Sequence, residues 1–198
     1  MKLRRRLAPL ALTAVAALGL SGCGELTPGT AANVDGARIT HEQVDDLVAA
    51  QCSAANASTE SGGAAAVPVS QVRQQSLGVL MDTTLSTKYA EDQQITPDKK
   101  IAAALFEQFE PTIATLPEAS RTELSKVFKA WALGRSAMIE AGSQSTGKPI
   151  TAAAAQELMT AGLADREKWL TKVDITTDAR YAPAANGFPG GGDGAASR

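Results

Sequence analysis

The sequence predicts a mainly α-helical domain with a little β-structure near its two ends. Through most of the chain, apolar residues recur at three- and four-residue steps, which is the pattern of amphipathic helices. Residues that favour helix starts precede several of these segments. Strand signals are confined to two short stretches, 33–39 and 173–176. We therefore expect a helical body that carries a short hairpin at its start and a short strand at its end.

The first 22 residues predict an export signal. Lys2 and Arg4–Arg6 give it a cationic start, and residues 7–20 form an apolar run of 14 residues. A permanent membrane-spanning helix needs roughly 20 apolar residues. The run is therefore too short to be an anchor and is typical of a secretory signal that is removed.

A lipidation site is predicted directly after this signal. The tetrapeptide Leu20-Ser21-Gly22-Cys23 resembles the bacterial lipobox, in which the cysteine sulfur is lipidated and the cysteine becomes the first residue of the mature protein. By this resemblance the chain is cleaved between Gly22 and Cys23, and residues 23–32 form a lipidated tether. Two or more acyl chains, such as palmitate, hold a protein firmly at a membrane. We therefore expect a lipoprotein on the extracytoplasmic face of a cell membrane.

Charge and cysteine content narrow the possible partners. Removal of residues 1–22 leaves 15 basic and 21 acidic residues, a formal net charge of −6. A nucleic-acid surface needs clustered Lys and Arg, so nucleic acid is not an expected partner.

With Cys23 lipidated, Cys52 has no cysteine left to pair with. We favour a small apolar role for Cys52 at the end of a helix, and a reactive or intermolecular thiol is the alternative.

The predicted domain covers residues 33–181 and opens with a hairpin over 33–39. Asp35-Gly36 lies between two apolar residues, and this dipeptide favours a two-residue type I′ turn. Gly36 supplies the positive φ that such a turn needs. The turn predicts two short antiparallel strands on either side of it.

The first helix is expected over residues 41–52. Thr40 precedes it as the N-cap and Gln43 follows three residues later, which is the pattern of a capping box. Residues 53–68 are rich in Ala, Ser and Gly and show no periodicity. They are therefore expected to form a flexible loop.

Two further helices are expected before the middle of the chain. Apolar residues at helical spacing predict a long amphipathic helix over residues 69–93. Thr96 is expected to cap the next helix, with Pro97 at its first position, where the missing N–H does no harm. Pro111 is expected to end that helix.

The second half of the chain predicts two more helices and the returning strand. Apolar positions from Leu124 to Met138 indicate a fourth helix that stops near Gly142. Thr151 is expected to cap a fifth helix. Residues 173–176 alternate as a half-buried strand does, and the Gly, Pro and Ala content of residues 182–198 predicts a disordered tail.

Three stretches carry a family resemblance. The segment Ala32-Asn33-Val34-Asp35-Gly36-Ala37-Arg38-Ile39-Thr40, the turn Ile95-Thr96-Pro97 and the late Arg180-Tyr181 occur in the order of the SurA and PrsA family of extracytoplasmic chaperones. The chain resembles the N-terminal chaperone domain of that family. The resemblance implies a helical domain in which the first hairpin pairs with the last strand.

The same resemblance implies that no prolyl-isomerase activity is present. Many members of the family carry an inserted parvulin domain, for which this chain has no room. Parvulin sites use paired histidines, whereas His41 is the sole histidine here.

Motifs for catalysis or metal binding lack the context they need. Residues 142–148 match the spacing of a phosphate loop as far as Lys148, but a helix precedes them and Pro149 replaces the Mg²⁺ ligand. Ser145 and Lys148 have the spacing of penicillin-binding enzymes without their companion motifs. His41-Glu42 lacks the second histidine of a zinc site. We therefore expect no enzyme activity, no metal and no cofactor.

The resemblance leads to a hypothesis of chaperone-like binding of unfolded exported polypeptides. Flexible and aromatic side chains suit promiscuous binding. The possible client groove comprises Met81, Phe106, Phe109, Phe128, Trp131 and Met138. At helical spacing any of these residues can instead be part of the core. The alternative function is an adaptor lipoprotein that docks one specific cell-envelope partner and has no general chaperone activity.

Overall fold

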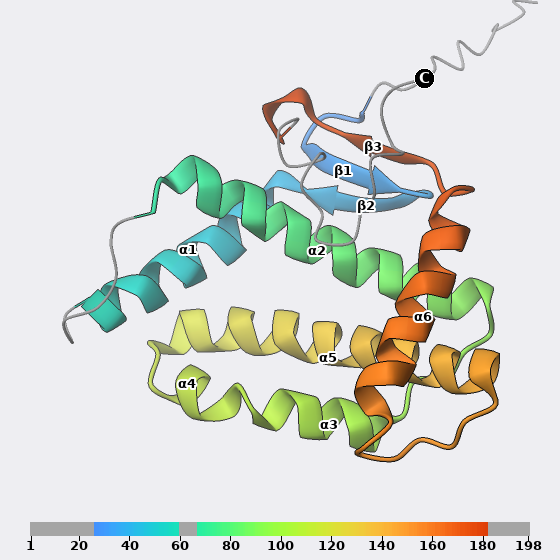
Figure 1. Ribbon diagram of the computed structural model, residues 1–198. Helices are drawn as coiled ribbons and strands as arrows, with labels where there is room; N and C mark the ends of the chain where they lie inside the picture. The colour runs from blue at the N-terminus through green and yellow to red at the C-terminus, as the bar shows by residue number, and fades with distance from the viewer. Residues whose placement is uncertain (1–25, 60–66, 182–198) are drawn as a thin grey trace, which may run out of the picture.

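The computed structural model describes residues 26–59 and 67–181, and it confirms the mainly α-helical fold with a small sheet (Figure 1). Its elements are β1 (Thr30–Val34), β2 (Ala37–Thr40), α1 (His41–Thr59), α2 (Val69–Asp92), α3 (Lys99–Glu107), α4 (Glu110–Ala114), α5 (Glu118–Thr146), α6 (Ala155–Leu170), β3 (Ile175–Thr177) and the 3₁₀ helix η1 (Ala179–Tyr181). The predicted signal peptide, the lipidation site at Cys23, the first three residues of the predicted tether (23–25) and the tail at 182–198 lie outside the described residues.

The sheet joins the two ends of the domain, as the family resemblance implies. Its strand order is β2-β1-β3, and both pairs are antiparallel. Val34 lies opposite Ala37 in β2 and opposite Ile175 in β3. Asp35 and Gly36 both have positive φ, 48° and 81°, which agrees with the predicted type I′ turn.

The hairpin begins earlier than predicted. β1 starts at Thr30 rather than at residue 33, so the last three residues of the expected tether belong to the sheet. The side chains of Ala31 and Ala32 are completely buried, in a core cluster that also contains Leu77 and Tyr181. Small side chains allow β1 to pack closely on the helices. This burial, which the sequence alone does not reveal, draws Ala31 and Ala32 into the strand.

Helix α1 has the predicted start but a later end. Gln43 Oε1 accepts a hydrogen bond from Thr40 N at 2.8 Å, and Gln43 N donates to Thr40 Oγ1 at 3.1 Å, so the capping box is confirmed. The helix continues to Thr59 instead of ending at residue 52. The prediction of a loop over 53–68 was therefore wrong for residues 53–59. Alanine is the strongest helix former, and neither Gly nor Pro occurs in this stretch.

The start of α3 and the role of Pro111 also differ from the prediction. The N-cap of α3 is Asp98, whose side chain accepts from the backbone N–H groups of Lys100 and Ile101. A carboxylate at this place is an effective cap, so the helix begins after Asp98 rather than after Thr96. Pro111 lies in the first turn of α4, where a proline is tolerated, and therefore begins a short helix instead of ending a long one.

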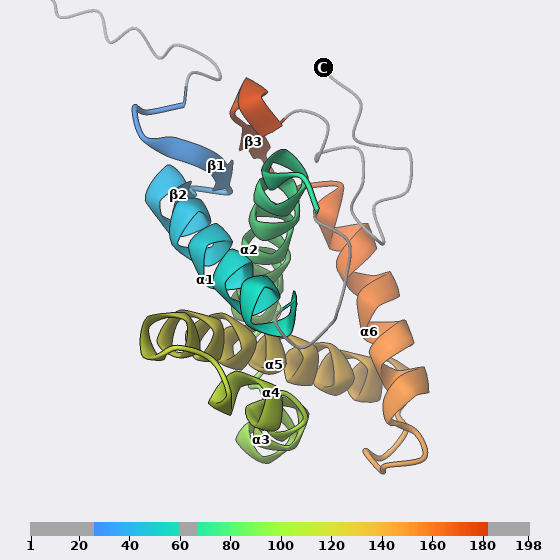
Figure 2. The ribbon, with the colours of Figure 1, turned by 90° about the vertical axis from the view of Figure 1, so that its left-hand side faces the viewer.

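Helix α5 is the central element of the body. Figure 2 shows α1 and α2 on one side of it and α3 and α4 on the other, with α6 crossing near its C-terminal half. The prediction that this helix stops near Gly142 was wrong, because it runs on to Thr146 and ends at Gly147 with a left-handed φ of 69°. A Cβ atom on Gly142 would overlap the Leu158 carbonyl of α6, and one on Gly162 would overlap the Met138 carbonyl of α5. The two glycines therefore permit a close helix crossing.

The last two predicted elements are present with shifted bounds. Thr151 Oγ1 accepts from Ala154 N at 3.2 Å, so it caps the turn that leads into α6, and the helix itself begins at Ala155. The returning strand is Ile175–Thr177 rather than 173–176. Its pairing with β1 fixes these bounds, since Asp35 N donates to Asp174 O just before the strand and Asp178 N donates to Ala31 O just after it.

A buried polar cluster ties α6 to α2 and α5. Arg166 Nη1 donates to Asp82 Oδ1 at 2.7 Å and to Ser86 Oγ at 2.7 Å, and Arg135 Nη2 donates to Asp82 Oδ2 at 3.3 Å. Arg166 is 8% exposed. A buried charge needs a paired, hydrogen-bonded partner, so Asp82 fixes the position of both arginines at this junction.

Candidate binding pocket

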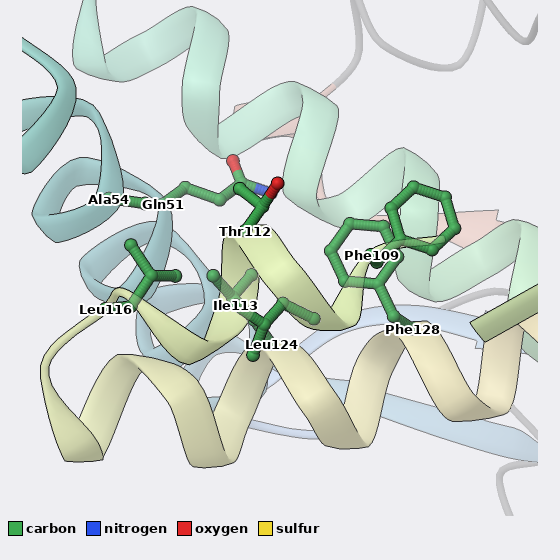
Figure 3. A pocket seen from close by; sticks show the side chains of 8 residues that line it. All are labelled: Gln51, Ala54, Phe109, Thr112, Ile113, Leu116, Leu124 and Phe128. Atoms are coloured by element: carbon green, nitrogen blue, oxygen red, sulfur yellow. The ribbon is translucent and has the colours of Figure 1, made fainter. Parts of the chain in front are cut away.

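An apolar pocket lies between α1, α4 and α5 (Figure 3). Figure 1 shows α4 and α6 toward opposite ends of α5. The volume of the pocket is about 280 Å³. Its lining residues are Gln51 and Ala54 from α1, Phe109, Thr112, Ile113 and Leu116 from α4 and its flanks, and Leu124 and Phe128 from α5. The lining is mostly apolar, and none of these side chains carries a charge at neutral pH. Such a pocket suits an apolar group.

The wall of the pocket is aromatic. The rings of Phe109 and Phe128 are stacked with centroids 4.5 Å apart, and Trp131 packs edge-on against Phe109 at 5.5 Å. Phe109 is the N-cap residue of α4, so the turn between α3 and α4 places its ring against α5. Aromatic pairs in these geometries stabilise each other beyond their buried area by about 0.5–1.5 kcal/mol. The wall is therefore held in place before any ligand binds.

The pocket lies where two core clusters meet. Leu116, Leu124 and Ala54 belong to a cluster between α1 and α5, while Ile113 and Phe109 belong to one between α3, α4 and α5. Phe128 contacts both clusters. Because α4 has only five residues, it covers little of the surface between them. Ile113, Leu116 and Leu124 are buried at this seam, whereas Phe109 and Phe128 are half-buried and remain accessible to a ligand.

Two neutral polar side chains lie at the edge of the pocket. Figure 3 shows the amide of Gln51 and the hydroxyl of Thr112 directed toward each other. Gln51 Oε1 accepts from Ser76 Oγ at 3.3 Å, which leaves its NH₂ group on the side of the pocket. An amide and a hydroxyl can donate to and accept from a peptide backbone. The arrangement can therefore hold an apolar side chain and hydrogen-bond the chain that carries it.

The structure separates the six predicted groove residues. Phe109 and Phe128 line the pocket, and Trp131 and Phe106 pack behind it. Met81 and Met138 do not reach it, because they are 2% and 0% exposed and belong to other core clusters. For these two methionines, and for Phe106, which is 8% exposed and does not line the pocket, the groove prediction was wrong and the core interpretation holds. Their helical spacing is the same as that of Phe109 and Phe128, so periodicity alone could not distinguish them.

Sequence reasoning missed most of the remaining lining. Ile113 and Leu116 went unnoticed because Pro111 was expected to end a helix, whereas α4 begins there. Gln51 and Ala54 lie in or beside the stretch that was expected to become a loop. A proline followed two and five residues later by large apolar residues is compatible with a new first turn, and this signal could have located α4.

Several of the residues considered for other chemistry make contacts within the fold. Cys52 is half-buried against the cluster beneath the sheet. Ser143 Oγ donates to the Lys148 carbonyl at 2.6 Å, and Lys148 Nζ pairs with Glu157, so the sequence 142–148 forms the end of α5 and its cap. In the described ranges, no cluster of three or more His, Cys, Asp or Glu residues could hold a metal ion.

A comparison with protein families identifies the domain. The model of the SurA-like N-terminal domain matches residues 6–111, more than half of the chain. The chain belongs to the SurA-like N-terminal domain family. The match covers the hairpin, α1, α2 and α3 and reaches Phe109 at the pocket, while α5 and α6 lie beyond it. No curated protein matches the chain, and no solved structure matches it.

The described helices were also compared with the requirements of a membrane span. Within residues 26–59 and 67–181, none combines the length and the apolar character that crossing a bilayer requires.

Proposed function

We propose that this chain is a lipid-anchored, extracytoplasmic protein that binds unfolded exported polypeptides through the pocket between α1, α4 and α5. The observation that carries the proposal is an open apolar pocket, with an aromatic wall and a neutral polar edge, in a member of the SurA-like N-terminal domain family. The proposal assigns no chemical step to the pocket. Its lining offers apolar contact and hydrogen bonds and no charged or titratable side chain.

The size of the pocket favours weak and unselective binding. A volume of about 280 Å³ holds one or two large side chains of a client. Burial of one such side chain contributes about 1.5–3 kcal/mol, and a dissociation constant of 1 mM already corresponds to about 4 kcal/mol. A single apolar anchor with two hydrogen bonds therefore binds reversibly. Reversible contact is what a protein needs if it holds a client and then releases it.

The lipobox supports a place for this binding at the membrane surface. If Cys23 is lipidated, six residues lie between it and Thr30 at the start of β1, which makes seven residue-to-residue steps. At about 3.5 Å per residue this segment spans at most about 25 Å. The domain would then remain close to the bilayer, where exported chains emerge. Mass spectrometry of the mature N-terminus tests the anchor, because an unmodified Cys23 would remove the basis for this localisation.

Aggregation assays test the binding function. The chain from Gly24 onward should suppress the aggregation of several unrelated unfolded proteins. Leu116→Gln, which places a polar side chain in the pocket, should reduce this protection. Leu133→Gln makes the same substitution at an exposed position outside the pocket, and it should protect as the unmodified chain does. Because Leu116 is buried, the unfolding transition of the Leu116→Gln variant is measured as well, and the comparison is made at a temperature at which it is folded.

The assays also separate this function from the adaptor alternative. If the unmodified chain protects none of the unfolded proteins, the chaperone proposal fails and docking of one specific envelope partner becomes the better account. If protection is present but Leu116→Gln and Leu133→Gln lower it equally, the function stands and the pocket is the wrong site.

A further inference from the structure

The aromatic wall of the pocket continues along α5 to an arginine. Phe128, Trp131 and Arg135 are spaced by three and four residues, so they lie on one side of the helix. Trp131 joins the wall through its edge-on contact with Phe109, and Arg135 Cζ lies 5.4 Å from the centroid of the Trp131 ring. A guanidinium at this distance is attracted to the face of an indole ring. The wall thus ends in a cation.

Arg135 belongs to a cluster that has a surplus of positive charge. Asp82 Oδ2 accepts from Arg135 at 3.3 Å and Asp82 Oδ1 accepts from Arg166 at 2.7 Å, so one carboxylate serves two guanidiniums. Within residues 26–59 and 67–181, neither arginine forms an ion pair with a second carboxylate. In the same part of the chain, the buried Nε of Arg166 has no hydrogen-bond partner. The cluster therefore has more positive than negative charge and more donors than acceptors.

The two arginines differ in what they can offer to a ligand. Arg166 is buried, and Ser86 Oγ holds its guanidinium as well as Asp82 does. The side chain of Arg135 is 23% exposed, and its bond to Asp82 is the longer of the two. A guanidinium has five N–H donors, and Arg135 uses one of them in this bond. Arg135 is therefore the member of the cluster that a ligand can reach, while Asp82 and Trp131 fix its position.

We propose that Arg135 binds an acidic side chain of the same polypeptide whose apolar side chain occupies the pocket. This inference rests on the proposed function and adds a preference to it, for clients that carry Asp or Glu near an apolar residue. A carboxylate suits the site because it is planar, accepts two parallel hydrogen bonds from a guanidinium and compensates the surplus charge of the cluster.

The spacing along α5 sets the place of the acidic residue in the client. Arg135 lies seven positions after Phe128, which is about 10.5 Å along a helix. An extended polypeptide rises about 3.3 Å per residue. We therefore expect the acidic residue about three positions from the apolar residue that enters the pocket.

The other charged side chains beside the wall do not cancel this preference. Lys129 Nζ lies 5.1 Å from the centroid of the Phe106 ring and adds positive charge. Glu107 and Glu110 lie close to Phe109 in the sequence, but both are exposed, so solvent and salt screen them. Arg135 differs from these residues because Trp131 and Asp82 hold it in a partly buried place, where screening is weaker.

NMR titration with two short peptides tests the preference. Both peptides are acetylated and amidated, so neither has a terminal carboxylate. One peptide has a single leucine with a glutamate three positions before it and another three positions after it, and the second has glutamine in place of both glutamates. The protein is the ¹⁵N-labelled chain from Gly24 onward, which contains every described residue.

The indole N–H signals of the two tryptophans report on binding. The Trp131 signal should shift with either peptide. Trp169, which contacts Tyr89 and Asp92 on α2, should not shift. At low salt the glutamate peptide should bind about three- to five-fold more tightly than the glutamine peptide, the size of one partly exposed ion pair. This gain should disappear at high salt.

Two variants at Arg135 and one control make the test specific. Arg135→Gln should remove the gain and leave the affinity for the glutamine peptide unchanged, and Arg135→Lys should retain part of the gain. Arg73→Gln is the matched control, because Arg73 also pairs with one carboxylate, Asp45, and it should keep the full gain. The proposal is overturned if the unmodified chain binds both peptides equally, or if a folded Arg135→Gln variant keeps the preference. A gain that persists at high salt overturns it as well, even if Arg135→Gln does not fold.

The same titrations separate this inference from the proposed function. Leu116→Gln, measured where it is folded, should weaken both peptides, because both place leucine in the pocket. If the peptides bind equally and Leu116→Gln weakens both, the pocket stands and the role of Arg135 fails. If neither peptide shifts the Trp131 signal, the proposed function fails together with this inference.

Discussion

The sheet end and the α4 end of the molecule both bury apolar side chains of α1, but only the sheet end is fully covered. Beneath the sheet, Ala31, Ala32 and Val34 have no exposed surface, and Tyr181 from η1 is buried with them. At the other end, a five-residue helix lies over aromatic side chains that are only half-buried, and a pocket remains (Figure 3).

The two ends differ in what packs over the apolar faces of the helices. An apolar helix face becomes core where other elements cover it completely, and it remains a binding surface where they do not. Three paired strands form a continuous layer over α1 and α2 (Figure 1). Helix α4 is about one turn long and cannot form such a layer. Apolar residues in well-packed cores make many contacts on all sides, whereas residues at a seam retain one side for a ligand.

The largest expected contrast is between two side chains of α5. Met138→Ala should lower the free energy of unfolding by about 2–5 kcal/mol, because it leaves a cavity in a fully buried site. Phe128→Ala should cost less stability, because one side of its ring faces the pocket. Urea unfolding of both variants measures this contrast. Equal losses would show that the α4 end is as well packed as the rest of the core.

A smaller effect is expected at the crossing of α5 and α6. Gly142→Ala should destabilise the fold by about 1–3 kcal/mol, because the added methyl group overlaps the Leu158 carbonyl and the helices must move apart. The matched control is Gly78→Ala in α2, where a Cβ atom meets nothing within 4 Å. That change should stabilise the fold by about 0.5–1 kcal/mol. Thermal unfolding of both variants measures these changes. A Gly142→Ala variant as stable as the unmodified chain would contradict the close crossing.

The smallest effect is expected from Asp178 on the surface of the closed end. Its pKa is lowered in the folded state, chiefly by the side-chain hydrogen bonds from Arg180. A lowered pKa means that the ionised form stabilises the fold above the ordinary pKa of about 3.9 and that this contribution disappears as the pH falls through the folded-state value. The melting temperature of Asp178→Asn should therefore lie below that of the unmodified chain at pH 6, and the gap should narrow below about pH 4. A gap that widens on acidification would contradict this sign.

Much of the fold could be predicted because local signals and tertiary packing agree in those places. Asp35-Gly36 can form a tight turn wherever it lies between strands, and Thr40 with Gln43 closes a capping box without help from the rest of the chain. Pairing of the first hairpin with the last strand came from the family resemblance. Neither β1 nor β3 contains a sequence signal that identifies the strand with which it pairs.

The predictions failed where one residue type fits two different structural roles. Pro111 can end a helix or begin one, and Gly142 can stop a helix or allow another helix to approach. Met138 and Phe128 share one apolar pattern on α5, yet one is core and the other lines the pocket. In each case the decision depends on a neighbour that is distant in sequence. For this reason only two of the eight lining residues, Phe109 and Phe128, could be predicted as part of a binding site.

Site-specific photo-cross-linking tests the central claim, that polypeptides bind at the pocket between α1, α4 and α5, most directly. A photoreactive amino acid at Thr112, on the edge of the pocket, should cross-link to unfolded exported polypeptides. The same amino acid at Thr160, an exposed threonine on α6, serves as the control. The account predicts strong cross-linking from position 112, loss of it when Leu116→Gln is added, and little from position 160. Equal cross-linking from the two positions, or none from position 112, would contradict it.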